Sequence, residues 1–196
     1  MSVRRVSWVI AMVCLALVTA SAGRTLSASG QEAQKPRRAP DIFFVPTPTE
    51  VVDAMLKVAG VGRNDIVYDL GCGDGRIVAT AARDYGARGI GIDIDPQRVA
   101  ESKETAKKFG VADKVKIMEG DIFEMPIGDA TVVALYLLPS LNVKLMPKLM
   151  KELKPGTRIV SHDFDMQGQW APEKHIEVTD KDGMKHDVYF WTIPKQ

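Results

Sequence analysis

From residue 47 to the C-terminus, apolar residues recur with two alternating spacings that predict helices and strands in turn. The first segment, residues 51–59, places its apolar side chains on one face of a helix. Thr47 as the N-cap, Pro48 at the first helical position and Glu50 two positions later predict the start of this helix. Gly60 predicts its end.

After this helix, short apolar runs alternate with amphipathic segments. Strands are predicted at residues 65–70, 88–93, 115–118, 131–137 and 158–162, and helices at 75–84, 96–109 and 141–153. Two further runs, 175–179 and 187–193, are joined by a turn at 182–183 and predict an antiparallel hairpin. Strands separated by helices imply a parallel sheet covered on both faces. The predicted fold class is therefore α/β, a Rossmann-like doubly wound sheet with a C-terminal antiparallel hairpin.

The first residues of the chain follow a different pattern. Arg4 and Arg5 precede an apolar run over residues 8–20, and the small residues Ala20 and Ala22 follow at the spacing of a cleavage site. This three-part order is typical of a secretory signal peptide. The apolar run is short for a helix that spans a bilayer permanently.

We therefore expect a signal peptide over residues 1–22, a flexible spacer over 23–40 and one domain over 41–196. An uncleaved N-terminal anchor is the alternative, and it would be the protein's only contact with a membrane. Both interpretations place the domain outside the cytoplasm, in the periplasm or secreted. A start codon downstream of this segment would instead leave the domain in the cytosol.

Charge and composition exclude some partners. Hydrophobic residues make up 45% of the chain and charged residues 26%, as in ordinary globular proteins. The net charge is +1, and about −1 once Arg4 and Arg5 are removed with the signal peptide. Because the remaining basic residues are scattered, we expect no nucleic-acid partner.

A glycine-rich loop follows the first predicted strand. Residues 69–76 read DLGCGDGR, so glycines stand at Gly71, Gly73 and Gly75 between the strand and the next helix. Glycine allows a tight turn here and lets a ligand approach the backbone closely. A dinucleotide-binding fingerprint would need its third glycine at Arg76, so the spacing disfavours that alternative.

The acidic residues around this loop indicate a cationic ligand. Asp69 precedes the loop and Asp74 lies within it. A pyrophosphate would be repelled by both carboxylates, whereas an ammonium and a sulfonium would be attracted. S-adenosylmethionine carries both of these cations, and it is the cofactor that we expect.

Further acids follow the next two strands. Asp93 ends the second strand, where its carboxylate can accept hydrogen bonds from both ribose hydroxyls. Asp95 is interpreted as the N-cap of the helix that begins at Pro96. Asp121 follows the third strand and can accept from the adenine amine, with Ile122 packed on the ring. A solvated loop acid is the alternative interpretation of Asp121.

At these residues the chain resembles the class I S-adenosylmethionine-dependent methyltransferases. The motif at 69–76, the acids Asp93 and Asp121, and LKPG at 153–156 carry the resemblance. VPTP at 45–48 and LYLLP at 135–139 are similar to a narrower group, the archaeal protein-lysine methyltransferases and the mitochondrial enzymes that methylate lysine in ATP synthase c-subunits. The resemblance implies the strand order 3-2-1-4-5-7-6 and a protein lysine as methyl acceptor.

Two residues are candidates for a catalytic role. Tyr136 follows the fourth strand and could orient a lysine amine through its hydroxyl or its ring face, or it could be a core aromatic residue. His162 ends the fifth strand and is a candidate base by its ordinary pKa, or a structural histidine. His175 and His186 form no recognisable metal-binding spacing with His162, so we expect no metal.

The binding residues do not by themselves prove catalysis. A small-molecule O- or S-methyltransferase remains an alternative function, and so does a non-catalytic domain that binds S-adenosylmethionine. The leading hypothesis is a methyltransferase that acts on a protein lysine.

Overall fold

Within residue 39 and residues 43–195, which the computed structural model describes, seven strands form one sheet in the order β3-β2-β1-β4-β5-β7-β6. Strands β1 to β5 run parallel, and β7 pairs antiparallel with both β5 and β6. The predicted fold class, strand order and C-terminal hairpin are all confirmed. The strands are β1 (Ile66–Leu70), β2 (Arg88–Asp93), β3 (Val115–Glu119), β4 (Val132–Leu135), β5 (Arg158–His162), β6 (Lys174–Thr179) and β7 (Lys185–Thr192).

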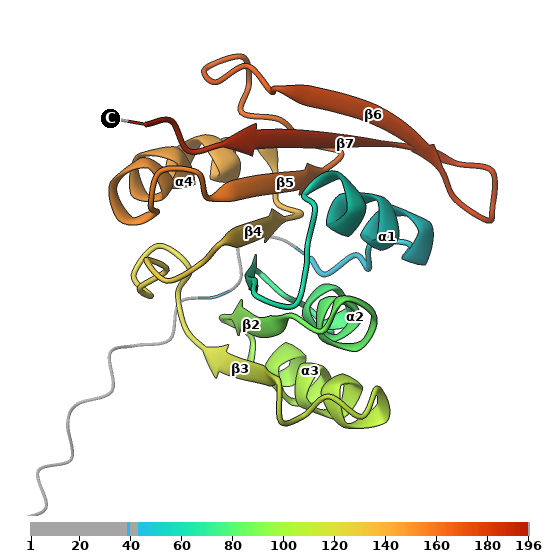
Figure 1. The fold of residues 1–196 in the computed structure, drawn as a ribbon. Coiled ribbons are helices and arrows are strands. Elements are labelled where there is room, and N and C mark those ends of the chain that lie inside the picture. The colour runs from blue at the N-terminus through green and yellow to red at the C-terminus, as the bar shows by residue number, and fades with distance from the viewer. Residues whose placement is uncertain (1–38, 40–42, 196) are drawn as a thin grey trace, which may run out of the picture. The chain divides into compact units, whose positions relative to one another are not determined.

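Helices cover both faces of this sheet. The helices are α1 (Thr49–Val58), α2 (Arg76–Tyr85), α3 (Pro96–Lys108) and α4 (Pro139–Glu152). Figure 1 shows α1, α2 and α3 along one face and α4 on the other. Successive residues of a strand point to opposite faces. In β4, Val132 therefore packs with α1 and α2, while Val133 packs with α4.

Several element boundaries differ from prediction by one or two residues, and two of these differences involve the site. Helix α1 begins at Thr49, with Pro48 as an N-cap that makes no side-chain capping hydrogen bond, so the expected capping box at Thr47 was wrong. The Thr47 hydroxyl instead contacts His162, 115 residues away. Strand β4 ends at Leu135, and the chain leaves the sheet at Tyr136. At Thr47 a tertiary contact thus outweighed the local sequence preference.

The predictions made for residues 1–40 concern a part of the chain that the structure describes only at residue 39. The signal peptide at 1–22 and nearly all of the spacer at 23–40 lie outside the described residues. Across the described residues, no helix has the length and apolarity needed to cross a bilayer.

Candidate functional site

A cavity of about 1070 Å³ lies at the carboxyl ends of the parallel strands. This is where ligands bind in doubly wound sheets, because the loops that leave the strands gather there. Its lining includes seven of the predicted site residues, and these are Asp69, Gly71, Asp74, Asp93, Asp121, Ile122 and Tyr136. They come from the ends of four different strands, so only the sheet order brings them together.

The loop between β1 and α2 has the conformation that its glycines predict. Gly71, Gly73 and Gly75 have φ angles of 86°, 55° and 76°, a region that other residues rarely adopt. The amide of Gly73 donates to the Asp93 carboxylate at 2.8 Å, which ties the loop to the end of β2. Gly73 and Gly75 are not among the residues that line the cavity. Gly73 and Gly75 contribute to the site through the left-handed backbone conformation that they give to the loop.

Three carboxylates converge around this loop. Asp69 is buried, and that burial, together with the charges of Asp93 and Asp74, raises its pKa to about 8. Burial also raises the pKa of Asp93, although backbone amides partly offset the effect. Asp74 forms an ion pair with Arg76 at 2.7 Å. A cationic ligand would relieve the repulsion among these acids, so the site favours positive charge.

Asp93 and Asp95 both line the cavity, but their carboxylates make different contacts. Asp95 accepts a hydrogen bond from the Gln97 amide at 2.8 Å and caps α3. Asp93 lines the cavity and is held in place by the amides of Gly73 and Asp95, at 2.8 and 2.9 Å. Its carboxylate is therefore oriented before a ligand arrives.

Asp121 and Ile122 follow β3, the strand next to β2. Both line the cavity, and the Asp121 carboxylate accepts from the Phe123 amide at 2.9 Å. The turn that holds Asp121 thus faces the cavity, and recognition of the adenine edge by Asp121 stays a prediction.

Tyr136 and His162 have different positions in the site. Tyr136 lines the cavity, and burial and the charge of Asp163 raise the pKa of its hydroxyl. His162 is fully buried, does not line the cavity and packs against Tyr136 with ring centroids 3.9 Å apart. Burial lowers the pKa of His162 to about 4. His162 has no direct access to an acceptor, which disfavours the interpretation of this residue as the base.

Several residues of the site were not predicted from the sequence. Phe44 lines the cavity and lies over Gly73, where an added Cβ would be 2.1 Å from the Phe44 ring. The Arg98 guanidinium lies over the same ring, 4.9 Å from its centroid. Arg76 donates to the Thr47 carbonyl at 2.8 Å, which fixes the segment that carries Phe44. No periodic pattern marks these contacts, because they join segments far apart in the sequence.

Two buried polar residues that were not predicted hold the backbone of the site in place. Ser102, on α3, is buried and donates to the Gly73 carbonyl at 2.7 Å. Asn142, on α4, is buried and donates to the Phe164 carbonyl at 3.1 Å, and Phe164 lines the cavity. Both are polar residues within helices, a sequence context that gives no sign of a role in the site.

Comparison with known proteins gives concordant results. Residues 69–174 match the family described as the ANTKMT methyltransferase domain. A protein-lysine N-methyltransferase from Saccharolobus islandicus is 48% identical over 155 residues, which cover 79% of this chain and 95% of that protein. The human lysine N-methyltransferase of the ATP synthase c-subunit is 29% identical over 130 residues, 66% of this chain and 54% of that protein. This chain therefore spans about half of the human relative.

One similar protein has been solved with a ligand bound. It is described as an RNA methyltransferase from Salinibacter ruber in complex with S-adenosyl-L-homocysteine. It shares 56% sequence identity with this chain at a TM-score of 0.72, and the match covers 78% of this chain and 95% of that one. S-adenosyl-L-homocysteine is the product left when S-adenosylmethionine donates its methyl group.

Proposed function

Because the chain belongs to the ANTKMT methyltransferase domain family and is an S-adenosylmethionine-dependent methyltransferase, we propose that its methyl acceptor is the ε-amine of a lysine in a protein. The similarity to the Saccharolobus islandicus enzyme, 48% identity over nearly all of that protein, is the observation that carries this proposal.

The residues of the site fit the cofactor. The converging carboxylates Asp69, Asp74 and Asp93 suit the ammonium and the sulfonium. The pKa of Asp69 is raised mainly by burial and further by the charges of Asp93 and Asp74, and a cation would offset that repulsion. In this proposal Asp93 accepts from the ribose hydroxyls, and Asp121 and Ile122 hold the adenine, which is supported by the position of all three in the cavity lining. The cofactor supplies a methyl group on a sulfonium, and this carbon is already activated toward a nucleophile.

The protein's own contribution is to orient the amine and exclude water. A lysine ammonium must lose a proton before its nitrogen can attack. Apolar residues beside Tyr136 line the cavity, namely Leu137, Leu138, Leu141 and Phe164, and an apolar surrounding favours the neutral amine. The face of the Tyr136 ring attracts the cationic form as it arrives.

The charge of the cavity favours lysine over RNA, the acceptor class named for the Salinibacter ruber protein. Among the described residues that line it, five are acids and two are arginines, the acids being Asp69, Asp74, Asp93, Asp95 and Asp121. Arg76 and Arg98 are paired with Asp74 and Glu101. A polyanion requires free basic groups, and both arginines in the described lining are already paired with acids.

Transfer of a labelled methyl group tests the acceptor. The full chain is incubated with S-adenosylmethionine and either total protein or total RNA from the source cells, and the modified residue is located by mass spectrometry. We expect label on lysine, and prior acetylation of the acceptor lysines should remove it. Asp93→Asn serves as the control for background transfer. Label in RNA, or on small molecules with hydroxyl or thiol groups, would contradict the proposal.

We also propose, from the N-terminal sequence pattern, that residues 1–22 export a domain formed by residues 41–196, with 23–40 as a spacer. Fractionation of cells with an antibody to the domain tests this, and the N-terminus of the recovered protein shows whether cleavage occurs. Recovery with the membrane fraction at full length would identify an uncleaved anchor. Recovery in the cytosol alone would defeat the proposal.

A further inference from the structure

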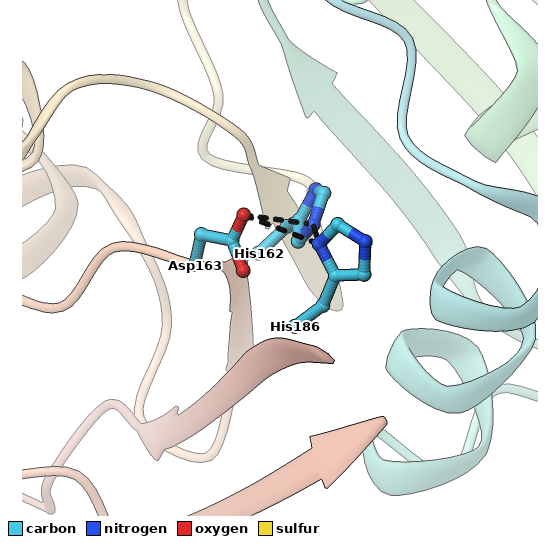
Figure 2. A group of neighbouring side chains, drawn as sticks. All are labelled: His162, Asp163 and His186. Carbon is cyan, nitrogen blue, oxygen red and sulfur yellow. Dashed lines mark hydrogen bonds and ion pairs between the residues drawn. The ribbon is translucent and has the colours of Figure 1, made fainter. Parts of the chain in front are cut away.

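Two of the chain's three histidines meet beside the cavity, at the edge where β5 pairs with β7. His162 is the last residue of β5 and pairs with Val188 of β7. Beyond it, the Asp163 amide donates to the Asp187 carbonyl at 2.7 Å, and this continues the antiparallel contact. His186 is thereby brought next to His162 and Asp163. Figure 2 shows the Asp163 carboxylate and the two imidazole rings turned toward one another.

The three side chains present one atom each to a common point. Nε2 of His162 lies 3.0 Å from Nδ1 of His186, and Oδ2 of Asp163 lies 3.3 Å from both nitrogens. In a tetrahedral zinc site with zinc–ligand distances of about 2.0–2.1 Å, neighbouring ligand atoms are about 3.3–3.4 Å apart. The triangle therefore matches one face of a zinc coordination tetrahedron to within a few tenths of an ångström.

In each histidine the second, outer ring nitrogen, which faces away from the common point, contacts an oxygen, as is usual for histidines that bind metals. Nδ1 of His162 lies 3.1 Å from the Thr47 hydroxyl, and Nε2 of His186 lies 3.3 Å from the Asp180 carboxylate. When each outer nitrogen donates its proton to these oxygens, both inner nitrogens carry lone pairs. Such outer contacts fix the tautomer and ring orientation of histidines that bind metals.

We propose that His162, Asp163 and His186 bind one zinc ion through Nε2, Oδ2 and Nδ1 respectively. Two imidazole nitrogens and a carboxylate oxygen are donors that zinc accepts readily. Three protein ligands leave a fourth position for water. The Asp163 side chain is 27% exposed, so this position has access to solvent, whereas His162 is buried.

The ion would join β5 to β7, the two strands that pair beside the cavity. It would also hold the His162 ring, which packs against Tyr136, so it would stabilise the fold and steady Tyr136. Tyr136 lines the cavity, whereas the three proposed ligands do not. The proposed ion is thus a positioning element, distinct from the methyl-transfer centre.

Calorimetric titration of the metal-free full chain with zinc chloride tests this proposal. The protein is prepared without a histidine tag and treated with a chelator. We expect one zinc ion per chain and a higher melting temperature with zinc. Cobalt chloride should produce the visible absorption of tetrahedral Co²⁺, without the charge-transfer band that a thiolate ligand adds.

Substitutions locate the site. His186→Gln and Asp163→Asn each remove a ligand from a partly exposed position and should weaken zinc binding about tenfold or more. His175→Gln is the matched control, because His175 is the third histidine, lies on the same hairpin and pairs with Asp187 instead. It should bind zinc as the original chain does.

Each variant is first shown to be folded by circular dichroism and to bind S-adenosylmethionine. A folded original chain that takes up no zinc would overturn the proposal, and would leave the three residues as a hydrogen-bonded network that shares a proton. Zinc binding that survives both ligand substitutions, or that is lost in His175→Gln, would overturn it equally. None of these results depends on the identity of the methyl acceptor.

Discussion

The Tyr136 ring lies against the His162 imidazole, with ring centroids 3.9 Å apart and an angle of 31° between the planes. Tyr136 follows β4 and lines the cavity, whereas His162 ends β5 and is completely buried. His162 is therefore a buried support, and Tyr136 is the member of the pair that lines the cavity.

Tyr136 is expected to act through its ring more than through its hydroxyl. Tyr136→Phe keeps the ring face and should leave kcat/KM for a lysine acceptor within about threefold of the original. Tyr136→Ala removes the face, and the loss of about 0.5–2 kcal/mol of cation–π attraction should lower kcat/KM by about 3- to 30-fold. Steady-state kinetics with an identified acceptor measure both values. Equal losses in the two variants would assign the role to the hydroxyl.

Asp93 is expected to bind the ribose and Asp95 to cap a helix. Asp93→Asn replaces a charged acceptor, and hydrogen bonds to charged groups contribute about 1.5–3 kcal/mol, so cofactor affinity should fall by at least about tenfold. Asp95→Asn keeps a good N-cap and should change affinity by less than about threefold. Calorimetry with S-adenosylmethionine compares the two. A larger loss in Asp95→Asn would reverse these assignments.

Cofactor binding is expected to release a proton from Asp69. Its pKa is raised to about 8, mainly by burial, so in the free protein it is largely protonated at neutral pH. A cationic ligand favours the carboxylate, and affinity should rise with pH toward about 8, by at most about tenfold per pH unit. Calorimetry in two buffers of different ionisation enthalpy counts the proton. If Asp69→Asn released the same number of protons on binding, the assignment to Asp69 would be contradicted. Comparison with this variant also corrects for the titration of the ligand's own amine.

The same shift makes a prediction for stability without a ligand. Asp69 has an ordinary pKa of 3.8 when unfolded and about 8 when folded, so the folded state holds this proton more tightly. The free energy of unfolding should therefore fall as pH rises from about 4 to about 8, and level off above that range. Asp69→Asn should lack this contribution and be more stable than the original chain at pH 8. Chemical denaturation at several pH values gives the difference, and parallel curves would refute the prediction.

Gly73 is expected to tolerate no side chain. Its φ of 55° costs other residues about 1–3 kcal/mol, and an added Cβ would clash with Phe44. Gly73→Ala should lower the melting temperature and weaken cofactor binding. The matched control is Gly62→Ala, since no atom lies within 4 Å of a Cβ there.

Adding Phe44→Ala to Gly73→Ala separates the two costs. It removes the clash and leaves the backbone strain, so stability should recover only in part. Full recovery, measured by thermal unfolding, would show that the backbone conformation carries no cost.

The glycine loop and its acids could be predicted because each depends on local chemistry. Left-handed backbone at Gly71, Gly73 and Gly75 favours glycine, and a carboxylate can be assigned to the end of a strand from the pattern of that strand. The alternation of strands and helices predicted the doubly wound sheet for the same reason, since the periods of 2 and 3.6 residues are properties of short segments. These features also carry the resemblance that implied the strand order.

Other residues of the site acquired their roles only in the folded chain. Thr47 was predicted to cap α1, yet its hydroxyl contacts His162, because burial of that histidine demands a partner more strongly than a helix end exposed to water does. Phe44 lies over Gly73 only because the N-terminal segment crosses the loop.

The cluster of His162, Asp163 and His186 marks the limit of sequence spacing most clearly. The two histidines are 24 residues apart, a separation that indicates no site, and no metal was expected from it. Antiparallel pairing of β5 with β7 reduces the distance between their ring nitrogens to 3.0 Å. Local chemistry thus determined the fold class and the glycine-rich loop from the sequence alone. The meeting of side chains from distant strands was decided by the tertiary structure, because sheet pairing brings residues together by register and not by their separation along the chain.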